Sequence, residues 1–291
     1  MRLFPFLFCP FWVLLLSLIS PLVFAAAQAE SAPGFSSRMQ ALERSLHGTI
    51  GVSVLNTTNG KRLQYNGNRR FAMCSTYKWL LVAAVLYKSE KVAGLLNRKL
   101  DYQARDIVPG YSPMTRKHLA QGMTVAELSQ AAVLSDNAAA NLLLEQVIGS
   151  PSKLNVFVRQ TGDHRFRLDR IEPAVNTAIP GDARDTTTPN AMTEDLTKIV
   201  LGDVLAKPQR AKLQSWLKAN NTGDARIRAA APQTWIIGDK TGTCAYGTTN
   251  DVGVIWPPHC SPIVISVFFT QSQKNAKPRD EVVAKIARLA L

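Results

Sequence analysis

The pattern of hydrophobic and polar positions is typical of strands at both ends of the chain. Residues 48–55 alternate with β-branched residues, and residues 62–65 form the return strand after Asn59-Gly60, a pair typical of hairpin turns. Near the C-terminus, three segments are predicted as strands separated by turns rich in Gly and Pro. A final segment has hydrophobic residues at helical spacing. The predicted strands are residues 48–55, 62–65, 234–239, 251–256 and 262–270, and the final helix is residues 277–291.

The middle of the chain has helical periodicity instead. Six helices are predicted there, at residues 77–92, 125–134, 138–148, 153–161, 193–200 and 208–218. This order predicts an α+β fold in which a five-stranded antiparallel sheet is built from both termini, flanked by helices, with an all-helical lobe inserted between its halves. We assign residues 30–71 and 226–291 to the α/β lobe. Residues 72–225 form the helical lobe, including an irregular loop at 167–189, and loops of that length are usually functional or disordered.

The first 29 residues have the pattern of a secretory signal. Arg2 precedes an apolar run over residues 3–24, and Ala27-Gln28-Ala29 fits a small-x-small cleavage site. A retained membrane anchor is the alternative, but three prolines interrupt the run. We therefore expect an exported, periplasmic protein without stable membrane insertion after cleavage.

Cleavage leaves 262 residues and lowers the net charge only from +13 to +12, because Arg2 is the single charge removed. The basic residues are scattered rather than gathered with aromatics in a stripe, and this distribution argues against a nucleic-acid partner. The four histidines have no paired spacing, and the cysteines are poorly spaced for zinc. We expect no metal and no cofactor.

The sequence Ser75-Thr76-Tyr77-Lys78 carries the first candidate chemistry. Ser-x-x-Lys also occurs at Ser150 and Ser215, where an ordinary amphipathic helix explains it. Only Ser75 opens a nearly all-apolar helix, and at this spacing the hydroxyl and the ammonium share one helix face. A lysine held against apolar walls has a lowered pKa, so it can act as a base toward a serine nucleophile.

Two further clusters have simpler alternative explanations. Ser135-Asp136-Asn137 could be a helix N-cap, and Lys240-Thr241-Gly242 could be a turn between edge strands. As site residues, Ser135 would pass a proton to a leaving nitrogen. Asn137 would hold an amide, and the Lys240 cluster would bind a carboxylate.

The irregular loop contributes Glu172 and Asn176, for which a surface acid is the default interpretation. Arg170 and Asp185 bracket this segment and could close it by an ion pair, and the Glu172–Pro173 bond could be cis. A loop closed in this way could hold a carboxylate and a water near Ser75.

Three cysteines survive cleavage, and an oxidising compartment favours a disulfide between two of them. Cys74 directly precedes Ser75, and Cys244 lies two residues beyond Gly242. If those clusters share one site, Cys74 and Cys244 pair, and Cys260 is left as a free thiol.

Taken together, these clusters resemble the class A serine β-lactamases over nearly the whole mature length. Residues 122–128, 167–170 and 183–187 are also similar to connecting segments of that family, whereas the approach to Ser135 is one residue shorter than usual. The pairing of Cys74 with Cys244 resembles the carbapenem-hydrolysing branch. The resemblance implies a monomer that hydrolyses β-lactams without a cofactor.

The resemblance also implies roles for single residues. Ser75 attacks the lactam carbonyl, and its N–H forms the oxyanion hole with that of Thr243. Lys78 and Glu172 share the activation of Ser75. The remaining roles are proton transfer by Ser135, Lys78 and Lys240, water activation by Glu172 with Asn176, amide binding by Asn137, carboxylate binding by Thr241, Thr243 and Arg226, and a flank of the mouth by Tyr111.

Two other functions share an acylated serine. A DD-peptidase would be inhibited by β-lactams, and a β-lactam sensor would stay acylated. The spacing of Glu172 and Asn176 in a closed loop favours hydrolysis, because it supplies a carboxylate for deacylation.

Overall fold

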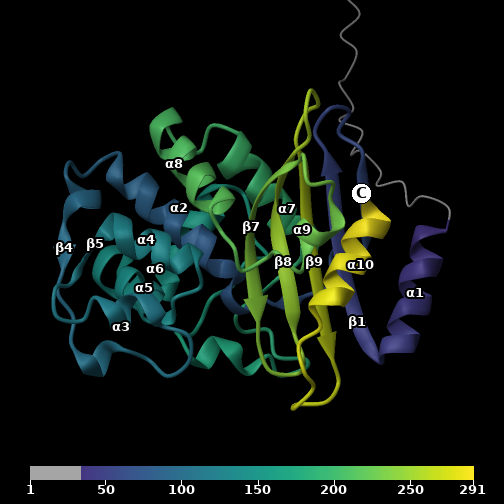
Figure 1. Cartoon of the computed structure of the whole chain (residues 1–291), viewed down its shortest axis with the longest axis horizontal. Helices are drawn as coiled ribbons and strands as arrows, with labels where there is room; N and C mark the ends of the chain where they lie inside the picture. Colours follow the sequence, from purple (N-terminus) through teal and green to yellow (C-terminus); the bar gives the residue numbers. More distant parts are fainter. Residues whose placement is uncertain (1–33) are drawn as a thin grey trace, which may run out of the picture.

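The computed structural model describes residues 34–291, so the expected signal segment lies outside the described residues. Five antiparallel strands form one sheet in the order β2-β1-β9-β8-β7, which joins the two ends of the chain (Figure 1). This confirms the predicted α+β fold class. The strands are β1 (Gly48–Asn56), β2 (Arg62–Tyr65), β7 (Ile236–Thr243), β8 (Thr249–Trp256) and β9 (Ile263–Gln271).

Helices α1 (Phe35–Leu46) and α10 (Asp280–Ala290) cover one face of the sheet (Figure 1). Alternate residues of each strand point to this face, among them Ile265 and Val267 of β9, while Val264 and Phe268 point to the other. Because both faces are covered, the central strands are buried almost throughout. α1 has no counterpart among the predicted helices.

The other face of the sheet packs on helices from the middle of the chain, with α2 (Tyr77–Ser89) at their centre. Ten of its residues are buried, because it is apolar on all sides. The surrounding helices are α3 (Pro113–Lys117), α4 (Val125–Val133), α5 (Asn137–Leu143), α6 (Pro151–Gln160), α7 (Pro189–Leu196) and α8 (Lys207–Lys218). The short helix α9 (Ile227–Ala230) instead packs against α10 on the opposite face of the sheet.

Two short strand pairs complete the structure. β3 (Phe71–Ala72) pairs with β6 (Thr186–Thr187), and β4 (Lys99–Leu100) pairs with β5 (Met123–Thr124). The first pair ties the segment before Ser75 to the end of the irregular loop. Within residues 34–291, no helix is long and apolar enough to cross a membrane. The lobe boundaries given above stay a prediction.

Candidate active site

Ser75 lies at the head of α2, in a single 3₁₀ turn formed by Cys74–Thr76. Lys78 follows on the first turn of α2 and is completely buried. Its Nζ lies 2.9 Å from Oε1 of Glu172 and donates hydrogen bonds to the carbonyl oxygen of Ser135 (3.0 Å) and to Oδ1 of Asn137 (2.6 Å). The ammonium group of Lys78 therefore joins three of the four predicted clusters. The exception is the Lys240 cluster on β7.

Burial lowers the pKa of Lys78, and the carboxylate of Glu172 partly opposes this effect. The neutral amine form therefore costs less free energy than it does in an exposed lysine. A lysine in this state can take a proton from a neighbouring hydroxyl and return it later.

Ser135 has a left-handed backbone conformation, with φ of 73°. It follows α4, where the N–H of Ser135 bonds to the carbonyl of Ala132 (3.0 Å) and that of Asp136 to the carbonyl of Ala131 (2.9 Å). This pair of hydrogen bonds is the Schellman motif, in which glycine usually occupies the left-handed position. Through it, the segment that follows α4 brings Ser135 against Lys78.

Asp136 anchors this segment from inside. It is fully buried and caps α5 by accepting from the N–H of Ala139, as the simpler alternative predicts. The same carboxylate also accepts from the N–H groups of Met114 and Thr115, at 2.9 and 3.0 Å. The cap and the site are therefore compatible, because capping by Asp136 fixes the residues on either side of it.

Lys240 reaches the site from β7, the edge strand of the sheet. It is fully buried, and its Nζ donates to Oγ of Ser135 and to the carbonyl of Thr241 (2.8 Å). Burial lowers the pKa of Lys240 well below its usual value, and the charge of Lys78 adds to this effect, while Asp239 opposes it. Ser135 thus lies between two lysines, one at its hydroxyl and one at its carbonyl.

Gly242 allows β7 to approach the head of α2. A Cβ atom at this position would lie 2.6 Å from the carbonyl oxygen of Met73 and 3.1 Å from Cβ of Cys74. The disulfide predicted between Cys74 and Cys244 is confirmed, with Cα atoms 5.7 Å apart, and Cys260 is free and exposed. Strand and helix head are therefore held together by close contact and by a covalent bond.

Arg226 is almost fully buried beside β7. Its guanidinium donates to Oγ1 of Thr243 (2.7 Å), to the carbonyls of Gly242 (3.1 Å) and Asn250 (2.6 Å), and to Asp280 (2.8 Å). These contacts fix the Thr243 hydroxyl at the end of the strand.

Thr241 also has a partner that the sequence analysis did not identify. Its hydroxyl lies 2.7 Å from that of Thr222, which precedes α9. Tyr111 is 57% exposed, and its carbonyl accepts from the N–H of Asn137 (2.8 Å).

The loop brings Glu172 to the head of α2. Oε2 of Glu172 accepts a hydrogen bond of 2.5 Å from Nδ2 of Asn176, and the Glu172–Pro173 bond is cis. The backbone of Glu172 is held by Asn141, whose amide group exchanges two hydrogen bonds of 2.9 Å with its N–H and C=O. Sequence reasoning missed Asn141, although it lies one turn after Asn137 on α5 and so shares its helix face.

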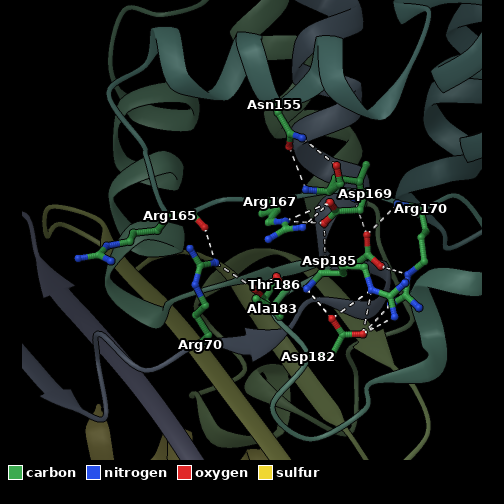
Figure 2. A network of polar contacts seen from close by, with 12 residues as sticks. Arg70, Asn155, Arg165, Arg167, Asp169, Arg170, Asp182, Ala183, Asp185 and Thr186 are labelled. Atoms are coloured by element: carbon green, nitrogen blue, oxygen red, sulfur yellow. Dashed lines mark hydrogen bonds and ion pairs between the residues drawn. The ribbon is translucent and has the colours of Figure 1, made fainter.

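A polar network closes the base of this loop (Figure 2). Asp185 is buried. Its carboxylate accepts hydrogen bonds from Nε of Arg170 (2.5 Å) and from the backbone N–H groups of Asp169 (2.7 Å) and Arg170 (2.9 Å). Its own carbonyl accepts from the N–H of Met73 (2.9 Å). The ion pair thus connects the two ends of the loop with the segment that leads into Ser75.

Comparison with known proteins gives one consistent result. The model of the Beta-lactamase enzyme family matches residues 34–291. The chain is 47% identical to "Beta-lactamase OXY-2" of Klebsiella oxytoca, over 95% of this chain and 96% of that protein. It is 51% identical to "Carbapenem-hydrolyzing beta-lactamase KPC" of Klebsiella oxytoca, over 86% and 85%. A solved structure of a beta-lactamase from Desulfarculus baarsii aligns with a TM-score of 0.86 at 48% identity, covering 90% of this chain and 97% of that one.

Proposed function

The chain belongs to the β-lactamase enzyme family, and we propose that it hydrolyses penicillins, cephalosporins and carbapenems through an ester on Ser75. The observation that carries this proposal is the contact of 2.9 Å between Lys78 and Glu172 at the head of α2. In this pair, Lys78 is the base for forming the ester, and Glu172 is the carboxylate for hydrolysing it. Hydrolysis of these drugs gives antibiotic resistance.

In the first half of the reaction, Ser75 attacks the lactam carbonyl while Lys78, together with Glu172, takes the hydroxyl proton. The N–H groups of Ser75 and Thr243 bind the oxyanion that forms. Ser135 then gives a proton to the ring nitrogen as the C–N bond breaks. The contact of Lys240 with the hydroxyl of Ser135 supports this step, because Lys240 can restore that proton, while Lys78 holds the carbonyl of Ser135 and keeps the proton taken from Ser75.

In the second half, Glu172 removes a proton from a water that attacks the ester carbonyl, and Ser75 leaves with a proton returned by Lys78. The hydrogen bond between Asn176 and Glu172 supports this role, since it holds an amide and a carboxylate side by side as partners for one water. A DD-peptidase or a sensor does not hydrolyse the ester, so neither function would need a carboxylate and a water partner at this position.

Binding of the substrate uses the rim of the site. Asn137 holds the side-chain amide, and the hydroxyls of Thr241 and Thr243 bind the carboxylate near Lys240. Arg226 contributes positive charge there and orients Thr243 through its hydrogen bond of 2.7 Å. Tyr111, which is exposed, flanks the mouth.

Carbapenem hydrolysis is proposed from two observations. The chain is 51% identical to a relative whose name states that activity, and the disulfide lies between the nucleophile segment and β7. Steady-state hydrolysis of imipenem tests this part alone. We further propose that the mature protein is periplasmic, since the N-terminal sequence has the features of a secretory signal, and that it is a monomer, as the resemblance to class A enzymes implies.

The decisive experiment separates the two halves of the reaction. In a Glu172→Gln protein, we expect a penicillin adduct on Ser75 to persist and turnover to fall by roughly 10²–10⁴-fold, the usual contribution of a general base. Intact-mass spectrometry detects the adduct. Glu194→Gln is the matched control, because Glu194 is exposed and, within residues 34–291, pairs only with Arg62. Stoichiometric acylation of the wild type for hours would instead support the peptidase or sensor.

A further inference from the structure

A cavity of about 360 Å³ lies behind the irregular loop. It is bounded by the start of β1, the end of β9, residues 69–72, and residues between 170 and 186 of the loop. Its lining residues all fall within residues 47–272, and none of the proposed catalytic residues is among them. The cavity is therefore distinct from the acyl site.

The charge of this cavity is strongly one-sided. Four arginines line it, against a single carboxylate from Asp182. Two of these arginines already have partners: Arg184 pairs with Asp182 at 2.7 Å, and Arg170 pairs with Asp185 at 2.5 Å (Figure 2). Within residues 34–291, neither Arg69 nor Arg70 forms an ion pair, and the charge of Asp163 only partly offsets that of Arg70.

These two arginines retain donors for a ligand. Within residues 34–291, the side chain of Arg69 makes no hydrogen bond or ion pair, and Arg70 donates only through Nη1, to the carbonyl of Arg165 and to Thr186. The pKa of Arg70 is lowered by burial and then by the charges of Arg165 and Arg167. An anion bound beside Arg70 would relieve this repulsion.

The remaining lining is mixed. Polar side chains from β1, β6 and β9 line part of it, and an apolar part is formed by Phe71 and Val175, which are buried, and by Ile179, which is 47% exposed and precedes Pro180. A large exposed hydrophobic side chain beside unpaired guanidinium groups suits a ligand with both an apolar and an anionic part. The volume lies within the range of about 300–1,000 Å³ that is usual for small-molecule sites.

We propose that this cavity binds an organic anion with a compact apolar body, such as an aromatic carboxylate or sulfonate. The anionic group would contact Arg69 and Arg70, and the apolar body would pack on Phe71 and Ile179. Binding here would be separate from the substrate carboxylate site near Lys240.

Naphthalene-1-sulfonate is a suitable probe, and naphthalene-1-sulfonamide is its uncharged counterpart. Fluorescence titration of the mature protein at low salt measures the dissociation constant, which we expect on the order of 0.1–1 mM for a ligand of this size. The sulfonamide should bind about tenfold more weakly, because it lacks the charge-assisted hydrogen bonds.

Variants then place the site. Arg69→Glu should weaken binding by about tenfold or more, and Ile179→Gln by several-fold. The matched controls are Arg159→Glu and Val156→Gln, which change exposed residues of α6 and should bind as the wild type does. If Arg69→Glu fails to fold, the comparison of Ile179→Gln with Val156→Gln gives the answer.

Two results would overturn the proposal. One is equal binding of sulfonate and sulfonamide, which would show that the cavity has no preference for an anion. The other is binding that survives Arg69→Glu and Ile179→Gln but is lost in Lys240→Ala, which would place the anion in the acyl site.

Discussion

The left-handed conformation of Ser135 predicts that function is maintained here at a cost in stability. A φ of 73° costs an L-residue roughly 1–2 kcal/mol, while glycine adopts it freely. Glycine also loses about 0.5–1 kcal/mol more conformational entropy on folding than alanine does. We therefore expect the Ser135→Gly protein to be about 0.5–1 kcal/mol more stable than the Ser135→Ala protein.

Comparing these two variants isolates the backbone. Both remove the hydroxyl that accepts from Lys240, so both should lose turnover, by a similar factor of roughly 10²–10⁴. Urea unfolding of each mature protein gives the stability difference, with equal slopes as the check that the unfolded states match. In thermal melts the gap should be about 1–4 °C. Equal stability of the two variants would refute the claim that this backbone is strained.

Three further predictions follow from buried contacts. Burial, and after it the carboxyl group of Asp163, raise the pKa of Asp195 well above 3.8. Above pH 3.8 the folded state therefore binds more protons than the unfolded state, and the free energy of unfolding falls as pH rises toward the folded pKa. Asp195→Asn should therefore stabilise the protein more at about pH 8 than at about pH 4 in urea unfolding. Gly242→Ala should destabilise by about 1–3 kcal/mol in the same assay, because its Cβ would lie 2.6 Å from the oxygen of Met73. Replacing Cys74 and Cys244 by serine should cost up to about 5 kcal/mol, since the bond closes a separation of 170 residues, and unchanged thermal unfolding would contradict this.

The main strands and helices could be predicted because their periodicity is local. A nearly continuous hydrophobic run marks β9 and an apolar surface surrounds α2, whatever lies elsewhere in the chain. Their ends were less predictable: the predicted strand at 234–239 continues through Lys240 to Thr243. Propensity does not favour Gly242 in a strand, and only its close contact with Met73 explains it.

The candidate chemistry was also visible in the sequence, because a nucleophile, two lysines and a carboxylate occur in clusters whose combination is specific even though each has a simpler explanation alone. The sequence by itself therefore determined which groups are available, and that Ser75 opens a buried helix.

Only the tertiary structure decided which groups meet. In it, Ser135 lies between Lys78 and Lys240. Arg226 donates to the hydroxyl of Thr243, and Asn141 binds the backbone of Glu172. These contacts join residues up to 105 positions apart, and their geometry depends on how α2, α5, the loop and β7 pack together. No local pattern encodes such distances, because they are set by the shared core and not by the segments themselves.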